Sequence, residues 1–436
     1  MPSQLSEAVT LPCGLTLPNR IAKAAMAENM APDHGPEQKF YKLYSQWGKG
    51  GWGAILTGNV QVDLNHLGQP NDLAFVSHEN GSIPAWKKYA DACQEHGTPA
   101  IVQICHPGRQ SFRGAGNRGL FSQTIAPSAV PLNIGDGWVN HFIRCLVFGS
   151  PREMTQADID IVTQHFIDTA KLMADSGFAG IELHGAHGYL IGQLQSSLVS
   201  SYVEGNTNGH PWTDQFLNPK SNIRTDAYGG SAEKRAKFLL DILAGCRKVV
   251  PPNFCIGVKL NSADHGSSGF EDCMTQIGLL VEAGIDFLEI SGGSYENPKM
   301  VGGDTNQGTQ KSARTIAREA FFIEFAHEAR KRYPDLILML TGGFRSRAGA
   351  EAAISSGACD LIGIGRPAAI YTDIPHKFLD ESLPDNEAWF SLRKVELPWF
   401  AKWLRSPAIG GGAETEYYRK QIERLAKGLL TYAPGA

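Results

Sequence analysis

Two histidines and a tyrosine lie close together in the segment 182–189, Glu-Leu-His-Gly-Ala-His-Gly-Tyr. The segment ends an apolar run of strand length, so a loop there can turn His184, His187 and Tyr189 toward one small cavity. Imidazole N–H groups and a phenol can polarise a carbonyl oxygen and deliver a proton. A hydrogen-bonded histidine pair with a purely structural role is the alternative.

A metal site is less well supported by this spacing. Histidine is a common metal ligand, but no carboxylate follows His184 or His187 at helical spacing, and Gly188 disfavours a helix there. We therefore expect no metal. The alternative that the sequence leaves open is a metal-dependent barrel hydrolase that uses His106 together with His184 and His187.

Two glycine turns in the C-terminal third predict an anion site. Gly342 and Gly343 follow one apolar run, and Gly365 with Arg366 follows the next. Glycine lets backbone N–H groups approach a phosphate, a helix N-terminus favours negative charge, and an arginine can donate two hydrogen bonds. Ordinary strand-to-helix turns that need glycine are the alternative interpretation.

Gln103 and Lys259 interrupt two other apolar runs. A buried amide or ammonium group needs a polar partner. The pyrimidine edge of a flavin offers donor and acceptor sites that match both groups. A satisfied polar network in the core is the alternative.

The elements that must position these residues form a repeated pattern of a short apolar run followed by a stretch of helical periodicity. Eight runs have strand length: residues 21–26, 53–60, 100–105, 179–184, 255–260, 287–291, 336–341 and 361–365. Helices are expected at 82–96, 155–176, 231–249 and 314–333. Eight parallel strands predict a (β/α)8 TIM barrel of class α/β rather than an open doubly wound sheet. Strands of such a barrel carry active-site residues at their C-terminal ends, where Asn59 also falls.

Two segments depart from the repeat. We expect residues 1–375 to form the barrel, with a loop insertion at about 196–218 on the active-site side. Residues 376–436 form a C-terminal helical extension, with an amphipathic helix at 413–430, that packs on the barrel or on a neighbouring subunit of a homo-oligomer.

Composition excludes several classes of protein. The chain has 436 residues, 42% of them hydrophobic, and a formal net charge of −4 with no basic block, so a nucleic-acid partner is not expected. The sequence contains neither a signal segment nor an apolar run long enough to span a bilayer, which predicts a cytoplasmic protein. The eight cysteines are spread singly, without a C-x-x-C pair, and indicate reduced structural thiols.

One apparent nucleotide motif fails its context. Residues 114–119 fit G-x-G-x-x-G, but polar residues flank them on both sides. The dinucleotide-binding fingerprint requires a preceding strand and a following helix. We interpret this segment as a loop.

Five runs of this chain resemble the Old Yellow Enzyme, or NADH:flavin oxidoreductase, family. They occur in family order: 17–21 (Leu-Pro-Asn-Arg-Ile), 103–109 (Gln-Ile-Cys-His-Pro-Gly-Arg), 184–190 (His-Gly-Ala-His-Gly-Tyr-Leu), 222–231 (Asn-Ile-Arg-Thr-Asp-Ala-Tyr-Gly-Gly-Ser) and 363–366 (Gly-Ile-Gly-Arg). Together they cover almost the whole barrel and are highly specific.

The resemblance implies FMN across the barrel mouth and NADH or NADPH as hydride donor. It implies that His184 and His187 bind the carbonyl or nitro oxygen of an activated olefin, while flavin N5 delivers hydride and Tyr189 delivers the proton. The cofactor contacts that it implies, with the strand-end residues Asn59 and Gly342 added, are Ala24, Ala25, Met26, Ala27, Asn59, Gln103, Lys259, Gly342, Gly343, Gly365 and Arg366.

Two residues depart from the family pattern. Ala27 stands where many relatives have Thr or Cys, and Lys259 replaces the more frequent Arg, which keeps the charge without the planar fork. A flavin-binding protein with little turnover is therefore a further alternative to an ene-reductase.

Overall fold

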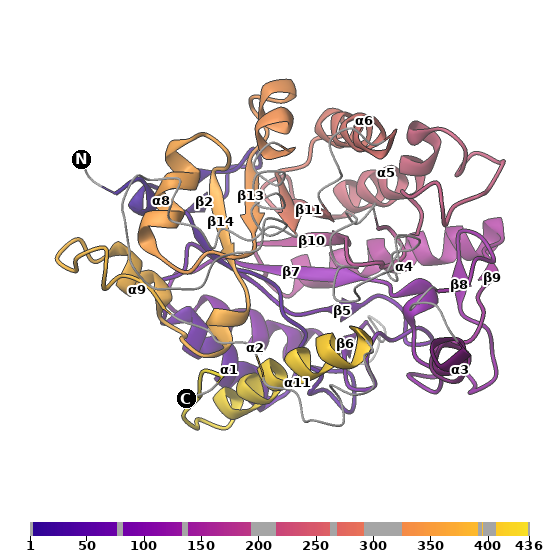
Figure 1. The fold of residues 1–436 in the computed structure, drawn as a ribbon, viewed down its shortest axis with the longest axis horizontal. Helices are drawn as coiled ribbons and strands as arrows, with labels where there is room; N and C mark the ends of the chain where they lie inside the picture. The colour runs from indigo at the N-terminus through magenta and orange to yellow at the C-terminus, as the bar shows by residue number, and fades with distance from the viewer. Residues whose placement is uncertain are drawn as a thin grey trace.

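Eight parallel strands close into a barrel (Figure 1) in the computed structural model, which describes residues 3–75, 82–132, 138–192, 215–261, 268–291, 325–390, 395 and 407–434. The barrel strands are β3 (Ile21–Lys23), β4 (Ala54–Leu56), β7 (Ala100–Cys105), β10 (Gly180–Gly185), β11 (Cys255–Asn261), β12 (Phe287–Ser291), β13 (Leu338–Thr341) and β14 (Leu361–Ile364). Neighbours follow chain order, and β7 pairs with β10 to close the ring. The predicted (β/α)8 barrel is confirmed.

Strand register brings the polar residues of different runs to one level. Glu182 lies opposite Gln103 across β10 and β7, His184 opposite Lys259 across β10 and β11, and Lys259 opposite Glu289 across β11 and β12. Alternate residues of a strand face the same side. The interior therefore carries a polar layer near the C-terminal strand ends, above an apolar one.

An N-terminal hairpin closes the opposite end of the barrel. Strands β1 (Val9–Thr10) and β2 (Thr16–Leu17) pair antiparallel after the short helix η1 (Gln4–Ser6). Leu11 and Leu17 pack in one apolar cluster with interior residues such as Phe287 and Leu361. This plug keeps the interior dry at the end away from the polar layer.

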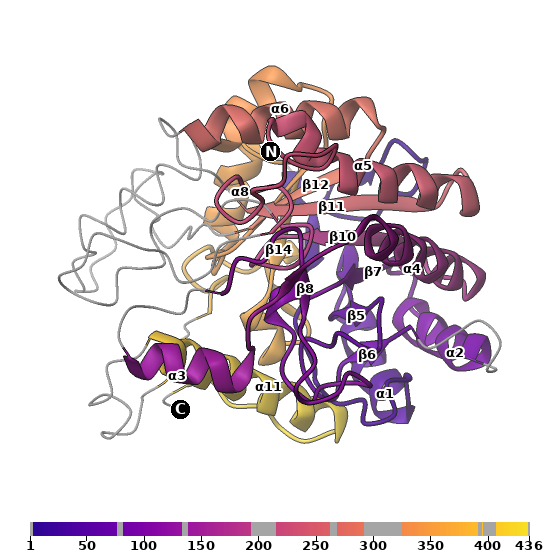
Figure 2. The same cartoon turned by 90° about the vertical axis from the view of Figure 1, so that its right-hand side faces the viewer.

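Helices form the outer layer, and Figure 2 shows α4, α5 and α6 side by side along one face. The outer helices are α1 (Gln38–Gly48), α2 (Ser82–Gln94), α4 (Gln156–Asp175), α5 (Ala232–Val249), α6 (Ser268–Glu282), a helix at 325–332, and α8 (Arg347–Ser355). Thr155 caps the N-terminus of α4 and forms a capping box with Asp158, and Ser231 caps the N-terminus of α5. Residues 314–324 of one predicted helix lie outside the described residues.

The predicted strand 53–60 is divided in the structure. Strand β4 ends at Leu56, and β5 (Val60–Gln61) pairs instead with the far end of β7 and with β6 (Leu73–Ala74). The break has a local cause, because the Gly58 N–H is bound by the Glu28 carboxylate and the Tyr44 hydroxyl rather than by a strand carbonyl. The chain thereby turns at Gly58 and Asn59.

Further segments surround the barrel mouth. The short helix η2 (Gly108–Gln110), strands β8 (Ile125–Ala126) and β9 (Arg152–Glu153), and helix α3 (Trp138–Val147) lie between β7 and α4. Of the predicted insertion 196–218, residues up to 214 lie outside the described part, and Phe216 and Leu217 are buried. The described helices include none that is long and apolar enough to cross a membrane.

The C-terminal segment returns to the start of the barrel. After η5 (Arg366–Ala369) and α9 (Ile374–Leu379), helix α11 (Pro407–Ala426) packs against α1 and η5, as Figure 1 shows for α1. The helix predicted at 413–430 thus begins and ends earlier. Gly428 adopts a φ of +70°, a left-handed conformation that ends the helical turn.

Candidate active site

His184 and His187 meet at the C-terminal end of β10. Their ring centroids are 5.2 Å apart with the rings nearly perpendicular. His184 is buried. His187 is exposed when the whole residue is counted, but its Nε2 is partly buried and lies 3.1 Å from the Ser291 hydroxyl on β12. The backbone of His187 has a φ of +57°, an uncommon conformation for a residue other than glycine. This tight turn brings the second imidazole back over the first.

The hydrogen bonds of His184 identify its donor nitrogen. The Ala186 N–H donates to His184 Nδ1 at 3.3 Å, so a neutral ring carries its proton on Nε2. Burial lowers the pKa of His184 well below its ordinary value, and His187 and Lys259 lower it further. The pKa of His187 is lowered as well, by desolvation first and by the Lys259 charge second. Both rings are therefore neutral at neutral pH and can donate to an oxygen.

Tyr189 stands beside this pair. Its ring centroid is 4.5 Å from that of His184, and its hydroxyl oxygen accepts a hydrogen bond from Asn59 Nδ2 at 3.0 Å. Burial raises the pKa of Tyr189 well above its ordinary value, so the phenol keeps its proton. The structure brings the three predicted catalytic residues together. It also places Asn59, predicted as a cofactor contact, against Tyr189.

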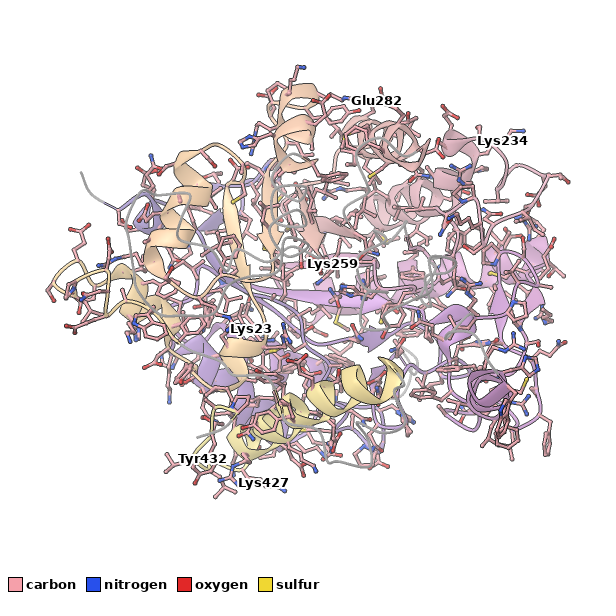
Figure 3. All side chains as sticks on the ribbon, in the orientation of Figure 1. Lys23, Lys234, Lys259, Glu282, Lys427 and Tyr432 are labelled. Atoms are coloured by element: carbon pink, nitrogen blue, oxygen red, sulfur yellow. The ribbon has the colours of Figure 1, made fainter. Side chains whose placement is uncertain are left out.

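A buried ionic layer lies directly below the histidines. Lys259 Nζ is 2.7 Å from Glu289 Oε1, and Gln103 Nε2 donates to Glu182 Oε2. Figure 3 places Lys259 near the middle of the barrel. Burial lowers the pKa of Lys259, but the carboxyl groups, Glu289 first and Glu182 second, outweigh this effect and raise the pKa overall. Lys259 is therefore a permanent cation beneath the mouth.

The two glutamates of this layer were missed in the sequence, although each is a carboxylate inside an apolar strand run. Burial and the neighbouring Glu289 charge raise the pKa of Glu182 well above its ordinary value, whereas Lys259 keeps the pKa of Glu289 low. One carboxyl is thus neutral and the other ionised. The layer carries one positive and one negative charge.

The predicted phosphate residues occupy adjacent strand ends. Gly342 and Gly343 have φ values of +135° and +75° after β13, and a Cβ added to Gly365 after β14 would meet nothing within 4 Å. Arg366 lies beside them, but its Nη1 is 2.8 Å from Glu414 Oε1 of α11 and its guanidinium lies over the Tyr418 ring. The turns are open to an anion, and α11 supplies a competing carboxylate.

The segment 24–27 forms the rim between β3 and β4. Ala24 is buried and its N–H donates to the Ile364 carbonyl at 3.0 Å, whereas Ala25, Met26 and Ala27 are half-buried. Three of these four residues are alanines, and the segment is only half-buried from Ala25 to Ala27.

The residues present fit FMN. Left-handed glycine turns with an arginine suit the phosphate, an amide and an ammonium group suit the edge of the ring, and the half-buried rim gives backbone for a flat ring to lie against.

The structure separates His106 from the other two histidines of the hydrolase alternative. Within the described part of the chain His106 groups instead with Asp63 and His66: Asp63 Oδ2 lies 2.6 Å from His66 Nδ1 and 3.7 Å from His106 Nε2. The Gly108 N–H donates to His106 Nδ1 at 3.0 Å, so the neutral ring carries its proton on Nε2. Burial lowers the pKa of His106 to about 4. Because Nδ1 accepts this bond and Nε2 carries the proton, the neutral ring as it stands has no free nitrogen lone pair for a metal.

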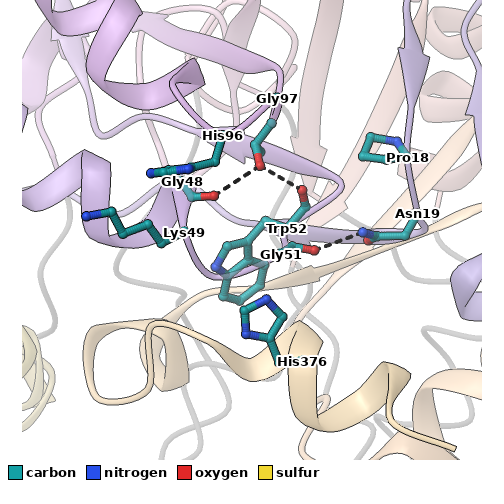
Figure 4. A pocket seen from close by; sticks show the side chains of 10 residues that line it. Pro18, Asn19, Gly48, Lys49, Gly51, Trp52, His96, Gly97 and His376 are labelled. Atoms are coloured by element: carbon teal, nitrogen blue, oxygen red, sulfur yellow. Dashed lines mark hydrogen bonds between the residues drawn. The ribbon is translucent and has the colours of Figure 1, made fainter.

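A cavity of about 430 Å³ (Figure 4) lies at the opposite end of the barrel, beside the N-terminal ends of β3, β4 and β7. Its walls are tied by structural hydrogen bonds: Asn19 Nδ2 donates to the Gly51 carbonyl at 2.9 Å, and Thr98 Oγ1 to the Trp52 carbonyl at 3.1 Å. Active sites of β/α barrels lie at the other face. We therefore assign this cavity no part in the chemistry.

Known proteins are similar to this chain in both sequence and fold. The sequence model of the NADH:flavin oxidoreductase / NADH oxidase family matches residues 10–201 and 207–386. The chain is 41% identical over 438 residues to the NADH-dependent flavin oxidoreductase iliE of Neonectria sp. (strain DH2), covering 96% of this chain and 54% of that protein. It is 42% identical over 406 residues to the protein of the same name from Hypocrea jecorina (strain QM6a), covering 92% of this chain and 95% of that one.

Solved structures support the fold. Morphinone reductase matches with a TM-score of 0.65 at 21% sequence identity. The match covers 87% of this chain and 90% of the morphinone reductase chain. The old yellow enzyme homologue from Zymomonas mobilis matches with a TM-score of 0.65 at 22% sequence identity, over 89% of this chain and 97% of the homologue.

Proposed function

Since the chain belongs to the NADH:flavin oxidoreductase / NADH oxidase family, whose enzymes hold FMN and use a nicotinamide donor, we propose that it reduces the activated C=C bond of α,β-unsaturated carbonyl or nitro compounds. One observation carries the proposal: two neutral imidazoles and a protonated phenol converge at the end of β10, directly above a buried lysine. Relatives that are about 40% identical have names that specify NADH, and we extend that donor to this chain.

The histidines bind and polarise the substrate in this proposal. His184 Nε2–H and the exposed His187 donate hydrogen bonds to the carbonyl or nitro oxygen. Such donors stabilise the negative charge that develops on that oxygen, and they make the β-carbon electrophilic. Because the pKa of each ring is lowered, neither imidazole loses its neutral donor form near neutral pH.

Tyr189 holds the proton that the product needs. FMN, when bound, supplies hydride chemistry between NADH and the β-carbon. The Tyr189 O–H donates to the α-carbon, and the Asn59 amide steadies the oxygen as it becomes negative. Gln103 and Lys259 would hold the flavin ring edge, Ala24 to Ala27 its face, and Gly342, Gly343, Gly365 and Arg366 its phosphate. Residues 376–436 are, in this proposal, a C-terminal extension that packs on the barrel or on a neighbouring subunit.

The test is an anaerobic visible spectrum of the FMN-loaded protein. We expect the flavin band to bleach on addition of NADH and to recover on addition of an enone. The proposal would be overturned if the protein bound no FMN or if NADH left the flavin band unchanged. If NADH bleached the band but neither an enone nor a nitroalkene restored it, olefin reduction would be rejected as the activity.

A further inference from the structure

We propose that Asp72 is the acid that returns a proton to Tyr189 after each turnover. The inference rests on the proposed function, because it concerns the proton that Tyr189 gives to the substrate. Asp72 lies in the loop between β5 and β6, and its carboxyl group belongs to none of the contacts described for the active site above.

The carboxyl group of Asp72 is buried and held in one orientation. Its exposed fraction is 2%, and its Oδ2 accepts hydrogen bonds from Gln61 Nε2 at 2.7 Å and from the Gln69 N–H at 2.9 Å. The other carboxyl oxygen accepts no hydrogen bond from the residues that the structure describes. The carboxyl group can therefore be protonated while it keeps both of these hydrogen bonds.

Gly68 marks the point where this carboxyl and the Tyr189 phenol approach each other. A Cβ added to Gly68 would lie 3.1 Å from Asp72 Oδ2 and 3.3 Å from the Tyr189 hydroxyl oxygen. It would also lie 2.9 Å from Gln61 Nε2. A side chain at position 68 would therefore contact both oxygens and crowd their approach. In this proposal a water molecule links the Asp72 carboxyl to the Tyr189 phenol.

Burial is the main reason that Asp72 keeps its proton up to about pH 7. Burial raises the pKa of Asp72 to about 7, the bonds from Gln61 and Gln69 oppose this, and the Glu28 charge adds to it. Tyr189 and the Cys105 thiol face the same region and have pKa values raised well above their ordinary ones by burial. A tyrosinate formed at Tyr189 is therefore a much stronger base than the Asp72 carboxylate.

The transfer balances without a further reagent. Tyr189 loses its O–H proton to the α-carbon and becomes a tyrosinate. The O–H bond of Asp72 then breaks, the O–H bond of Tyr189 re-forms, and the Asp72 carboxylate takes a proton from solvent. No electron changes place in these steps.

Glu28 is a second buried carboxyl group, whose charge acts on Asp72, but its hydrogen bonds hold it at another place. It accepts from the Tyr44 hydroxyl and from the Gly58 N–H. These contacts fix the turn that carries Asn59 rather than approach the Tyr189 phenol. Asp72 is thus the carboxyl group placed to return a proton to Tyr189.

The experiment measures reoxidation of the reduced, FMN-loaded enzyme by an enone across the pH range. In the wild type we expect the rate to fall as pH rises through about 7. Asp72→Asn should slow reoxidation by roughly tenfold or more at pH 6 and remove this inflection. Gly68→Ala keeps the carboxyl and fills the gap, and it should slow the same step. Reduction by NADH serves as the internal control and should be unchanged in both variants.

Testing Asp72→Asn in the Tyr189→Phe variant separates proton transfer from a structural effect of Asp72. In Tyr189→Phe the phenol that Asp72 serves is gone, so adding Asp72→Asn should cause no further loss. Infrared spectra of the unreacted protein give a readout apart from turnover: a protonated carboxyl band present at pH 5.5 and absent at pH 8.5 should be missing from Asp72→Asn.

The outcomes distinguish this inference from the proposed function. A wild type that turns over while Asp72→Asn keeps both its rate and its pH inflection overturns the relay alone. An additive loss in the Tyr189→Phe background does the same. A wild-type reduced flavin that no enone reoxidises overturns the proposed function, and the relay with it.

Discussion

The side-chain amide of Asn59 donates a hydrogen bond to the Tyr189 hydroxyl across 3.0 Å, joining the turn after β4 to the loop after β10. This bond lowers the pKa of Tyr189, whereas burial raises it. Asn59 therefore makes the phenol a better proton donor. Its position depends on Gly58, whose N–H is held by Glu28 at 3.1 Å and by the Tyr44 hydroxyl at 2.8 Å.

Replacing Asn59 by Leu should slow proton delivery. A donor to a developing oxyanion contributes roughly 10²–10³-fold to rate at the upper end, and we expect a loss of about tenfold or more here. Stopped-flow reoxidation of the reduced flavin by an enone measures it, with NADH reduction as the unaffected half-reaction. Equal slowing of both half-reactions would show instead that Asn59 contacts the cofactor, as the sequence predicted.

The double variant His184→Ala with His187→Ala should abolish enone reduction and leave FMN bound. Both rings lie on the substrate side of the ionic layer, so their loss removes the donors to the substrate oxygen without touching the glycine turns. Absorbance of bound flavin and steady-state enone turnover measure the two properties. His96→Ala is the control, because His96 lines the cavity at the opposite end of the barrel. Unchanged turnover in the double variant contradicts the assignment of both histidines.

The barrel and the histidine cluster were predictable because their signals are local. Each strand is a short apolar run, and His184, His187 and Tyr189 follow one such run within a few residues. Asn59 and Asp72 were not assigned to Tyr189, because their pairing depends on how strands far apart in the chain close the ring. Glu182 and Glu289 carried a readable signal, since a carboxylate within an apolar strand requires a buried partner.

Arg366 illustrates the same limit at the phosphate end. Its guanidinium pairs with Glu414 on a helix that the sequence predicted but did not place. The paired carboxylate repels a phosphate, so Glu414→Gln should tighten FMN binding and Arg366→Ala should weaken it. Fluorescence titration of the apoprotein at low salt measures both, and the Glu414→Gln effect should shrink as salt screens the charge. If the wild type, Glu414→Gln and Arg366→Ala bound FMN with equal affinity, the phosphate would not lie beside Arg366.

Replacing either Glu182 or Glu289 alone should lower the free energy of unfolding much less than replacing both. Lys259 lies 2.7 Å from Glu289, and the neutral carboxyl of Glu182 is close enough to influence the Lys259 charge. In Glu289→Gln, Glu182 can ionise and replace the missing partner. The double variant leaves a buried, unpaired ammonium group, which costs roughly 3–5 kcal/mol.

Denaturant unfolding of the two single variants and the double variant measures this coupling. We expect a loss in the double variant well above the sum of the single losses. Additive losses would show that the two carboxylates act independently of Lys259.

Asp72 should also make stability depend on pH in a way that is separate from turnover. The pKa of Asp72 is raised to about 7 in the folded protein, whereas an unfolded aspartate titrates near 3.9. The folded protein therefore retains a proton that the unfolded chain releases between these values. The stabilisation from that proton is fully present below about pH 4 and is lost as pH rises through about 7. Asp72→Asn has no such proton and keeps a neutral side chain of the same shape.

The free energy of unfolding of Asp72→Asn, relative to the wild type, should rise between about pH 4 and about pH 8 by an amount on the order of 4 kcal/mol. Urea unfolding at a series of pH values measures the difference, which cancels the titration of every other group that both proteins share. Asp63→Asn is a matched comparison, because Asp63 is also buried, but its interactions with His106 and His66 lower its pKa and keep it ionised. That variant should show no gain at high pH. Parallel stability curves for Asp72→Asn and the wild type would mean that Asp72 is already ionised at neutral pH, and it would then have no proton to return to Tyr189.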